Sequence, residues 1–317
     1  MMTLNVRAHR VVEALLERAD EHKIAAHPIE RGGRLVDCGL EVRGGLAAGL
    51  VLARICTAGL ADVTLVPGEV GGHACPFVQI ATDHPVRACL ASQYAGWALS
   101  EGKFFAMGSG PMRAARGREK IFEKIGYCEE VELVVGVLEG RKKPTASVIA
   151  TIADECRVAP SCVTLLVAPT ASLAGGVQIV ARSVETALHK LSELDFDLTR
   201  IQSAHGFAPL PPVAANDLAG IGRTNDAILY GARVTLYVTG DDDTIADVGP
   251  KVPSVSSHDY GEPFAAIFAR YNNDFYAVDP HLFSPAEVVF QNVDSGRVHV
   301  FGRTAHDVLI RSFSWPP

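Results

Sequence analysis

The N-terminal segment alternates apolar and charged residues at helical spacing. Apolar residues recur every three or four positions, with arginine and glutamate between them: Leu4, Ala8, Val11, Val12, Leu15, Leu16 and Ala19. This pattern predicts an amphipathic helix that packs on a globular body. Charges interrupt it too often for a signal peptide or a membrane span. We therefore expect a soluble, cytoplasmic protein with no membrane partner.

Two later stretches follow one order of elements and begin about one hundred residues apart. Each has a helical pattern, a VTL strand, a Gly-Gly loop, the tripeptide VQI, and then helix, strand, helix and strand. In the first stretch, the patterns cover 46–57, 63–66, 78–80, 85–99, 104–107, 112–125 and 131–137. In the second, they cover 144–157, 163–166, 177–191, 196–202, a helix ending near 230, and 234–238.

This shared order predicts an α/β fold of two similar lobes produced by internal duplication, although two generic α/β runs can also match by chance. The first lobe would comprise residues 1–143 with the N-terminal helix. The second would comprise 144–317 with a C-terminal extension, and the lobes could interleave. Because clefts between lobes are preferred ligand sites, we expect the ligand cleft between them.

The helix predicted over 177–191 carries a candidate site. A helical wheel places the apolar residues on one face, and Gln178, Arg182, Glu185 and His189 on the other. Arg182 and Glu185 could be a carboxylate base held by a guanidinium at the wall of a cleft. They could instead be an exposed i,i+3 ion pair, which is common and worth only a few tenths of a kcal/mol. Spacing alone favours the ion pair.

Two further segments join small and polar residues to a helix. Met107 to Arg113 passes from a strand into a helix through Ser109 and Gly110, and free N–H groups at such a turn can receive an anion. Residues 222–226, with Arg223 and Asn225, have similar chemistry beside an apolar helix. Either segment could also be an ordinary connection between secondary-structure elements, with no role in binding.

Other classes of function have less support. The net charge of −7 argues against a nucleic-acid partner, which needs clustered Lys and Arg. His73 and Cys75 are only two potential ligands, and the acidic run 241–243 lacks the further carboxylates of a calcium loop. We therefore predict no metal site. The seven cysteines form no CxxC pair, which is typical of reduced thiols in a cytoplasm.

Five long stretches carry a wider resemblance and span nearly the whole chain in order. They are GGLAAGLVLARICTAGLADV, HPVRACLASQYAGWALSEGKFFAMGSGPMRA, GGVQIVARSVETALHKL, GRTNDAILYGARV and HDYGEPFAAIFARYNNDFYAVDPHLFSPAEV. Together they resemble the methenyltetrahydromethanopterin cyclohydrolase family. The resemblance implies a two-lobed α/β enzyme with a pterin cleft, no metal, no tightly bound cofactor, and a homotrimeric assembly.

The resemblance also implies a reaction in one-carbon metabolism, either formaldehyde oxidation or methanogenesis. The enzyme would reversibly hydrolyse 5,10-methenyltetrahydromethanopterin to the 5-formyl compound, with tetrahydromethanopterin as the carrier. The family's catalytic R-x-x-E pair matches Arg182 and Glu185. Glu185 would be the general base for water, and Arg182 would orient it. Family-like motifs also contain residues expected to bind substrate: Ser109, Gly110, Arg113, Arg223, Asn225 and Tyr260.

Three other functions remain open on the residues alone. The chain could bind a pterin without catalysis, serve as an assembly protein whose charged pairs are salt bridges, or act on tetrahydrofolate. Nothing in the sequence reports the methyl groups or the tail of the pterin, so the choice of carrier rests on the resemblance.

Overall fold

The computed structural model describes residues 2–29 and 32–316, which form two compact units that interleave along the chain. Unit 1 comprises Met1–Ala61 and Arg87–Gln178, and unit 2 comprises Asp62–Val86 and Ile179–Pro317. The boundary expected near residue 143 falls inside the second segment of unit 1. The units interleave because the segment 62–86 forms strands that pair with β9 (Ile201–Pro209) of unit 2.

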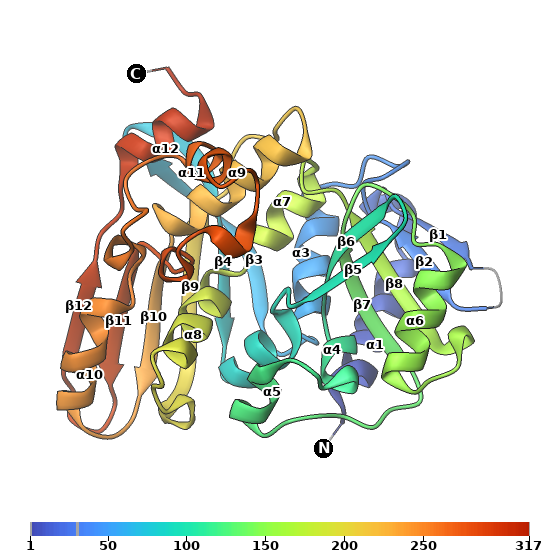
Figure 1. Ribbon diagram of the computed structural model, residues 1–317, viewed down its shortest axis with the longest axis horizontal. Helices are drawn as coiled ribbons and strands as arrows, with labels where there is room; N and C mark the ends of the chain where they lie inside the picture. Colours follow the sequence, from blue (N-terminus) through green and yellow to red (C-terminus); the bar gives the residue numbers. More distant parts are fainter. Residues whose placement is uncertain (1, 30–31, 317) are drawn as a thin grey trace. The chain divides into compact units, whose positions relative to one another are not determined.

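Unit 1 contains a mixed six-stranded sheet (Figure 1). The three inner strands β2, β8 and β7 run parallel, and β1, β6 and β5 are antiparallel to their neighbours. All six residues of β8 are buried, as is typical of a parallel strand covered on both faces. The order is β1 (Ala25–Pro28), β2 (Arg34–Asp37), β8 (Val163–Ala168), β7 (Val134–Glu139), β6 (Phe104–Ser109) and β5 (Trp97–Glu101).

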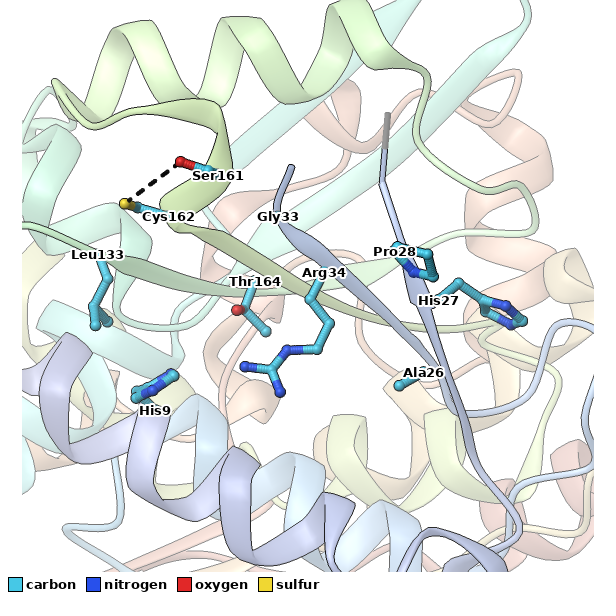
Figure 2. A pocket seen from close by; sticks show the side chains of 10 residues that line it. All are labelled: His9, Ala26, His27, Pro28, Gly33, Arg34, Leu133, Ser161, Cys162 and Thr164. Atoms are coloured by element: carbon cyan, nitrogen blue, oxygen red, sulfur yellow. Dashed lines mark hydrogen bonds between the residues drawn. The ribbon is translucent and has the colours of Figure 1, made fainter. Parts of the chain in front are cut away.

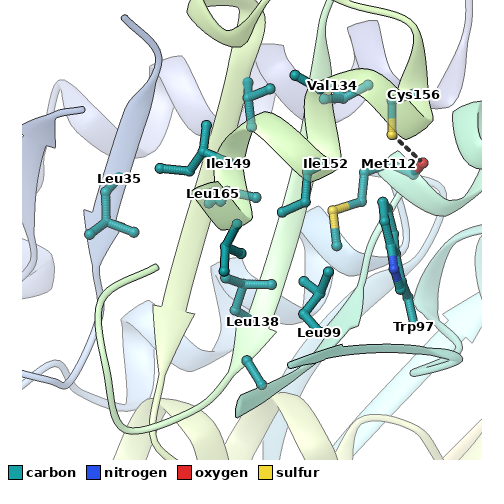
Figure 3. Close-up of a cluster of buried hydrophobic side chains, with 14 of the residues drawn as sticks. Leu35, Trp97, Leu99, Met112, Val134, Leu138, Ile149, Ile152, Cys156 and Leu165 are labelled. Atoms are coloured by element: carbon teal, nitrogen blue, oxygen red, sulfur yellow. Dashed lines mark hydrogen bonds between the residues drawn. The ribbon is translucent and has the colours of Figure 1, made fainter. Parts of the chain in front are cut away.

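The helices of unit 1 supply its core. Thr3 and Thr145 cap α1 and α6, each accepting a backbone N–H with its side chain. Ile149 and Ile152 of α6 pack in one cluster with Leu138 of β7 (Figure 3). The helices are α1 (Leu4–Leu16), α2 (Ala19–His22), α3 (Leu46–Cys56), the π-helix η1 (Val86–Gln93), α4 (Met112–Arg116), α5 (Lys120–Ile125), α6 (Ala146–Cys156) and the 3₁₀ turn η2 (Pro160–Cys162).

Unit 2 contains a second mixed sheet of six strands. Only β10 and β11 are parallel neighbours; the other pairs are antiparallel. Burial alternates along β9, β10 and β11, which indicates one covered face and one open face. The order is β12 (Val298–Gly302), β11 (Glu287–Asn292), β10 (Arg233–Val238), β9, β4 (His73–Thr82) and β3 (Asp62–Val70).

The helices of the second half begin with α7 (Leu173–Val180), within which the unit boundary falls. Figure 1 shows α8 and α10 on the same side of the unit 2 sheet. None of the described helices is long and apolar enough to cross a membrane. The remaining elements are α8 (Ser183–Glu193), α9 (Asp217–Leu229), α10 (Asp242–Val248), α11 (Phe264–Arg270), α12 (His306–Phe313) and the 3₁₀ turns η3 (Leu198–Arg200), η4 (Gly249–Lys251), η5 (Ser254–Ser256), η6 (Phe275–Ala277) and η7 (Pro280–Leu282).

The α/β prediction is confirmed, while several element boundaries differ from the expected ones. The helix expected over 112–125 is two helices, because Gly117 takes a left-handed conformation (φ 62°) and ends α4. The helix expected over 177–191 is also two, α7 and α8. The two strands that contain the sequence VTL lie in different positions in their sheets. The strand β3 is at the edge of its sheet and antiparallel to its neighbour, whereas β8 is an inner strand that is parallel to its neighbours. The duplication itself remains a prediction.

Candidate functional site

Arg182 lies in the turn that joins α7 to α8. Its backbone (φ −87°, ψ 10°) is outside the helical region, and its N–H donates to the carbonyl of Ile179 at 3.0 Å. Its own carbonyl accepts the N–H of Thr186 at 3.0 Å, and α8 begins at the next residue, Ser183. Glu185 is therefore in the first turn of a helix, where the positive end of the helix dipole favours a carboxylate. The helical wheel missed this break.

Arg182 and Glu185 form a buried pair. Arg182 Nη1 lies 3.7 Å from Glu185 Oε2, and the two residues are only 6% and 4% exposed. The alternative of an exposed ion pair is therefore wrong. Burying two charges costs several kcal/mol per ion, and mutual attraction offsets that cost only when the geometry is good. At 3.7 Å the contact is longer than a charge-assisted hydrogen bond. A catalytic role for the pair stays a prediction.

Close packing fixes α8 against the sheet of unit 2. A Cβ on Gly206 of β9 would lie 2.6 Å from Ser183 Oγ and 2.9 Å from a methyl of Val184, so only glycine lets the helix approach. At the other end, the buried Lys190 donates to the carbonyl of His281 at 2.7 Å. Burial lowers the pKa of Lys190 to about 8. These contacts hold both ends of the helix that carries Glu185.

Ser109 and Gly110 form a tight turn at the end of β6 in unit 1. Ser109 is fully buried, and its hydroxyl donates to the carbonyl of Val137 at 3.3 Å and lies 3.6 Å from Cys56 Sγ. Gly110 has φ 88°, a conformation that favours glycine, and its N–H donates to the carbonyl of Ser92 at 2.9 Å. The turn is thus held rigidly by its own unit.

Arg113 is enclosed by side chains and carbonyls of unit 1. The residue has no exposed surface. Its Nη1 donates to the carbonyl of Leu90 at 3.0 Å, and its Nε donates to Glu119 at 2.9 Å. The guanidinium lies over the rings of Tyr94 and Phe122, 4.8 and 5.2 Å from their centroids. Direct contact between Arg113 and a ligand stays a prediction that this burial does not favour.

Arg223 and Asn225 lie on α9 of unit 2. The guanidinium of Arg223 donates to the carbonyls of Pro212 and Ser312 at 3.2 and 3.3 Å, and so holds the C-terminal segment. Asn225 Nδ2 donates to the carbonyl of Ile221 at 2.8 Å, within its own helix. Their contacts with substrate remain predictions.

Tyr260 and Asp226 also belong to unit 2. Asp226 lies in the segment 222–226 that the sequence pointed to, but it was not itself predicted as a site residue. The ring of Tyr260 lies 5.0 Å from that of Tyr230, and burial raises the pKa of Tyr260. Asp226 has no exposed surface; it accepts from the backbone of Phe264 at 2.8 Å and from Ser312 Oγ at 2.5 Å. Burial raises the pKa of Asp226 to about 7.

Unit 1 contains a second polar group that was only partly foreseen. Gln178, which the wheel had placed beside Arg182, is fully buried and donates to Glu139 at 3.0 Å. Cys56 Sγ lies 3.8 Å from Gln178 Oε1. Glu139 was missed, although its place at the carboxyl end of a parallel strand is a known signal for functional residues.

One group of described residues could hold a metal ion by donor type and distance. Donor atoms of His27, Asp37 and Glu41 lie within 4.8 Å of one another. However, both carboxylate oxygens of Asp37 accept backbone N–H groups of residues 39–42, and Glu41 pairs with Lys143 at 2.8 Å. Protein contacts account for this arrangement, and we assign no metal to it.

Unit 1 also has a cavity of about 530 Å³ beside β1 and β2 (Figure 2). His9, Arg34 and Thr164 line it, and Arg34 pairs with Glu13 at 2.5 Å. None of the eight predicted site residues lines this cavity.

Comparison with known proteins identifies the family. Residues 3–313 match the model of the family described as "Cyclohydrolase (MCH)". A methenyltetrahydromethanopterin cyclohydrolase of Rhodopirellula baltica is 52% identical over 287 residues, covering 89% of this chain and 86% of the relative. Enzymes of that name from a Methylobacterium species and Methanocorpusculum labreanum are 44% and 43% identical, covering 98% and 99% of both chains. The chain belongs to the MCH cyclohydrolase family.

Proposed function

We propose that this protein hydrolyses 5,10-methenyltetrahydromethanopterin reversibly to 5-formyltetrahydromethanopterin. The observation that carries the proposal is the buried Arg182–Glu185 contact in a chain of this family. Relatives similar over nearly their full length bear the name of this activity. The role in one-carbon metabolism follows from the substrate, which carries a single carbon between two nitrogens.

The proposed mechanism begins with a substrate carbon that is already electrophilic, because it lies in an amidinium cation. Glu185 accepts a proton as the water oxygen bonds to this carbon. The tetrahedral adduct then collapses: its hydroxyl loses a proton, the bond from carbon to N10 breaks, and N10 gains a proton. One proton is released overall, and the carbon remains on N5 as a formyl group.

Arg182 has a supporting role in this proposal. Its guanidinium orients the Glu185 carboxylate and the water, and it stabilises negative charge that develops on the added oxygen. A carboxylate is a weak base at neutral pH. A weak base suffices for a substrate this reactive.

The substrate-binding residues are proposed from motif similarity. The turn at Ser109 and Gly110, together with Arg223, Asn225 and Tyr260, would contact the pterin or its tail. Because Arg113 is fully enclosed, we propose that it acts indirectly by holding the helix after Gly110. The ligand cleft that the sequence led us to expect between the two lobes is part of the same proposal.

The assembly and setting are proposed on similar grounds. We infer a cytoplasmic homotrimer that has no tightly bound cofactor and uses tetrahydromethanopterin as its carrier substrate. The family resemblance supports the trimer. The seven cysteines form no disulfide in the described structure, as suits a reducing compartment.

A spectrophotometric assay tests the reaction. Purified protein is mixed with the methenyl derivatives of tetrahydromethanopterin and of tetrahydrofolate, and loss of the methenyl absorbance is followed. We expect the protein to catalyse the loss of methenyl absorbance from the methanopterin derivative, and to act far more slowly on the folate derivative. Stoichiometric binding without turnover would instead indicate a pterin-binding protein. Faster turnover of the folate derivative would overturn the choice of carrier.

A further inference from the structure

Glu139 ends β7, at the edge of the unit 1 sheet where the parallel strands β2, β8 and β7 have their carboxyl ends. The residue before it, Leu138, packs in the core cluster that contains residues of α6 (Figure 3). Because neighbouring side chains of a strand point to opposite faces, Glu139 points away from that cluster. It is only partly buried. Ligands of α/β proteins commonly bind at the carboxyl ends of parallel strands, so this carboxylate is placed where it can meet one.

Gln178 of α7 fixes the direction of the Glu139 carboxylate. Its Nε2 donates to Glu139 Oε1 at 3.0 Å, while Cys56 Sγ lies 3.8 Å from its Oε1. Gln178 has no exposed surface, so its amide is held among protein groups. A carboxylate has about four acceptor sites on its two oxygens. Glu139 can therefore accept the N–H of Gln178 together with N–H groups of a ligand.

A carboxylate in this setting selects a ligand with paired N–H donors. Its charge repels phosphate and carboxylate groups, and partial burial strengthens the hydrogen bonds that it accepts. Two parallel N–H groups in one plane match the two oxygens of a carboxylate, as in the pairing of arginine with carboxylates. The pterin of the proposed substrate has such an edge, because its 2-amino group and its N3–H lie side by side.

Chain connectivity limits the distance from Gln178 to the candidate catalytic pair. Gln178 comes four residues before Arg182, so their Cα atoms are at most about 14 Å apart even in a fully extended chain. The turn between them is not extended, since the N–H of Arg182 donates to the carbonyl of Ile179 at 3.0 Å. In a pterin, the 2-amino edge belongs to one ring, and N5, which holds the reacting carbon, belongs to the other. This separation suits a single pterin that uses both Glu139 and the catalytic pair.

We propose that Glu139 binds the 2-amino and N3–H edge of the pterin, and that Gln178 positions its carboxylate. The proposal deepens the proposed function and rests on its choice of a pterin substrate, but not on the reaction or its base. Glu139 is then a specificity-determining residue, because a ligand without the 2-amino group forms one hydrogen bond where the pterin forms two.

Binding of the carrier tests the contact from the side of the protein. Isothermal titration calorimetry with tetrahydromethanopterin, in the absence of oxygen, gives the dissociation constants of wild type, E139Q and E132Q. Glu132 is the matched control, because it is an exposed glutamate just before the same strand. We expect E139Q to bind about 10- to 100-fold more weakly, as the loss of a hydrogen bond to a charged group implies, and E132Q to match wild type. Binding by E139Q within twofold of wild type would overturn the proposal.

A change in the ligand distinguishes this contact from a structural role of Glu139. 6-Methyltetrahydropterin and its analogue without the 2-amino group are titrated into the same proteins. Wild type should bind the amino form about tenfold more tightly, whereas folded E139Q should bind the two forms within twofold of each other. A wild type without this preference, or an E139Q protein that keeps it, would contradict the proposal.

E139D is the second variant in case E139Q does not fold. It keeps the charge, so it should keep the preference for the amino form, and loss of that preference in folded E139D would count against the contact. Methenyl turnover is measured on the same samples. Normal turnover with unchanged carrier binding in E139Q would remove the contact and leave the reaction. Glu139-dependent binding without turnover in wild type would remove the reaction and leave the contact.

Discussion

Arg182 and Glu185 are 6% and 4% exposed, with charged atoms 3.7 Å apart at the start of α8. A hydrophobic pair of similar volume would fill the same space without a desolvation cost. Retaining two charges there makes sense when a carboxylate must accept a proton and a guanidinium must hold it in place. Their value to the protein is therefore expected to appear in turnover more than in stability.

Asp226 is expected to make stability depend on pH. Its pKa rises from 3.8 to about 7 on folding, so between these values the folded state holds a proton that the unfolded state releases. Stability is therefore greatest below about pH 4 with respect to this group, and falls as pH rises towards 7. The contribution is on the order of 2–4 kcal/mol. Urea unfolding of wild type and Asp226→Asn from pH 4.5 to 7.5 measures it.

The Asp226→Asn variant should lose most of this fall in stability, whereas Asp247→Asn, on the exposed side of α10, should keep it. A wild-type protein whose free energy of unfolding is flat across this range would contradict the assignment. The same result in both variants would also contradict it.

At the residue scale, motif similarity pointed to Arg182 and Glu185 as the candidate pair, but their burial could not be foreseen. A helical wheel reports which residues share a face, and does not report what covers that face. The burial of Asp226, in the segment 222–226, could not be foreseen for the same reason: it depends on Phe264 of α11 and Ser312 of α12, which are 38 and 86 residues further along the chain. Glu139 could have been found from its position at the end of a parallel strand.

The element that positions the site is α8, seated on β9 at Gly206. A methyl group at this position would meet Ser183 and Val184, the residues between Arg182 and Glu185. The break between α7 and α8 sets where this helix starts, and so places Glu185 in its first turn. Local periodicity continued across that break, which is why one helix was expected.

Gly206→Ala should lower turnover by moving the first turn of α8. We expect a loss of about 1–3 kcal/mol in the free energy of unfolding, as is typical of overpacking, and a fall in kcat that exceeds the change in KM. Urea unfolding and steady-state kinetics check both quantities. Gly45→Ala is a suitable control, because nothing lies within 4 Å of its added Cβ. An unchanged kcat in Gly206→Ala would show that the close packing of α8 on Gly206 does not position Glu185.

At the scale of the whole molecule, the chain passes between its two units three times. The sequence pattern foresaw the α/β class and most strands, because apolar periodicity is a local property. It did not foresee that the hairpin of β3 and β4 joins β9, some 120 residues away, since alternation reveals a strand and not its partner. The open face of the unit 2 sheet follows from that pairing and was equally invisible.

The central claim for the whole molecule is that it hydrolyses the methenyl carrier with Glu185 as the base. The direct measurement is the steady-state rate of methenyl loss for wild type, Glu185→Gln and Glu193→Gln, with the melting temperature of each. Glu193 is the matched control, because it is an exposed glutamate at the end of the same helix.

Glu185→Gln preserves the shape of the side chain and removes its basicity. The account predicts that kcat falls about 10²- to 10⁴-fold in Glu185→Gln, with KM within a few-fold of wild type and a folded protein. Glu193→Gln should match wild type. A folded Glu185→Gln protein whose activity stays within a factor of two of wild type would contradict the account.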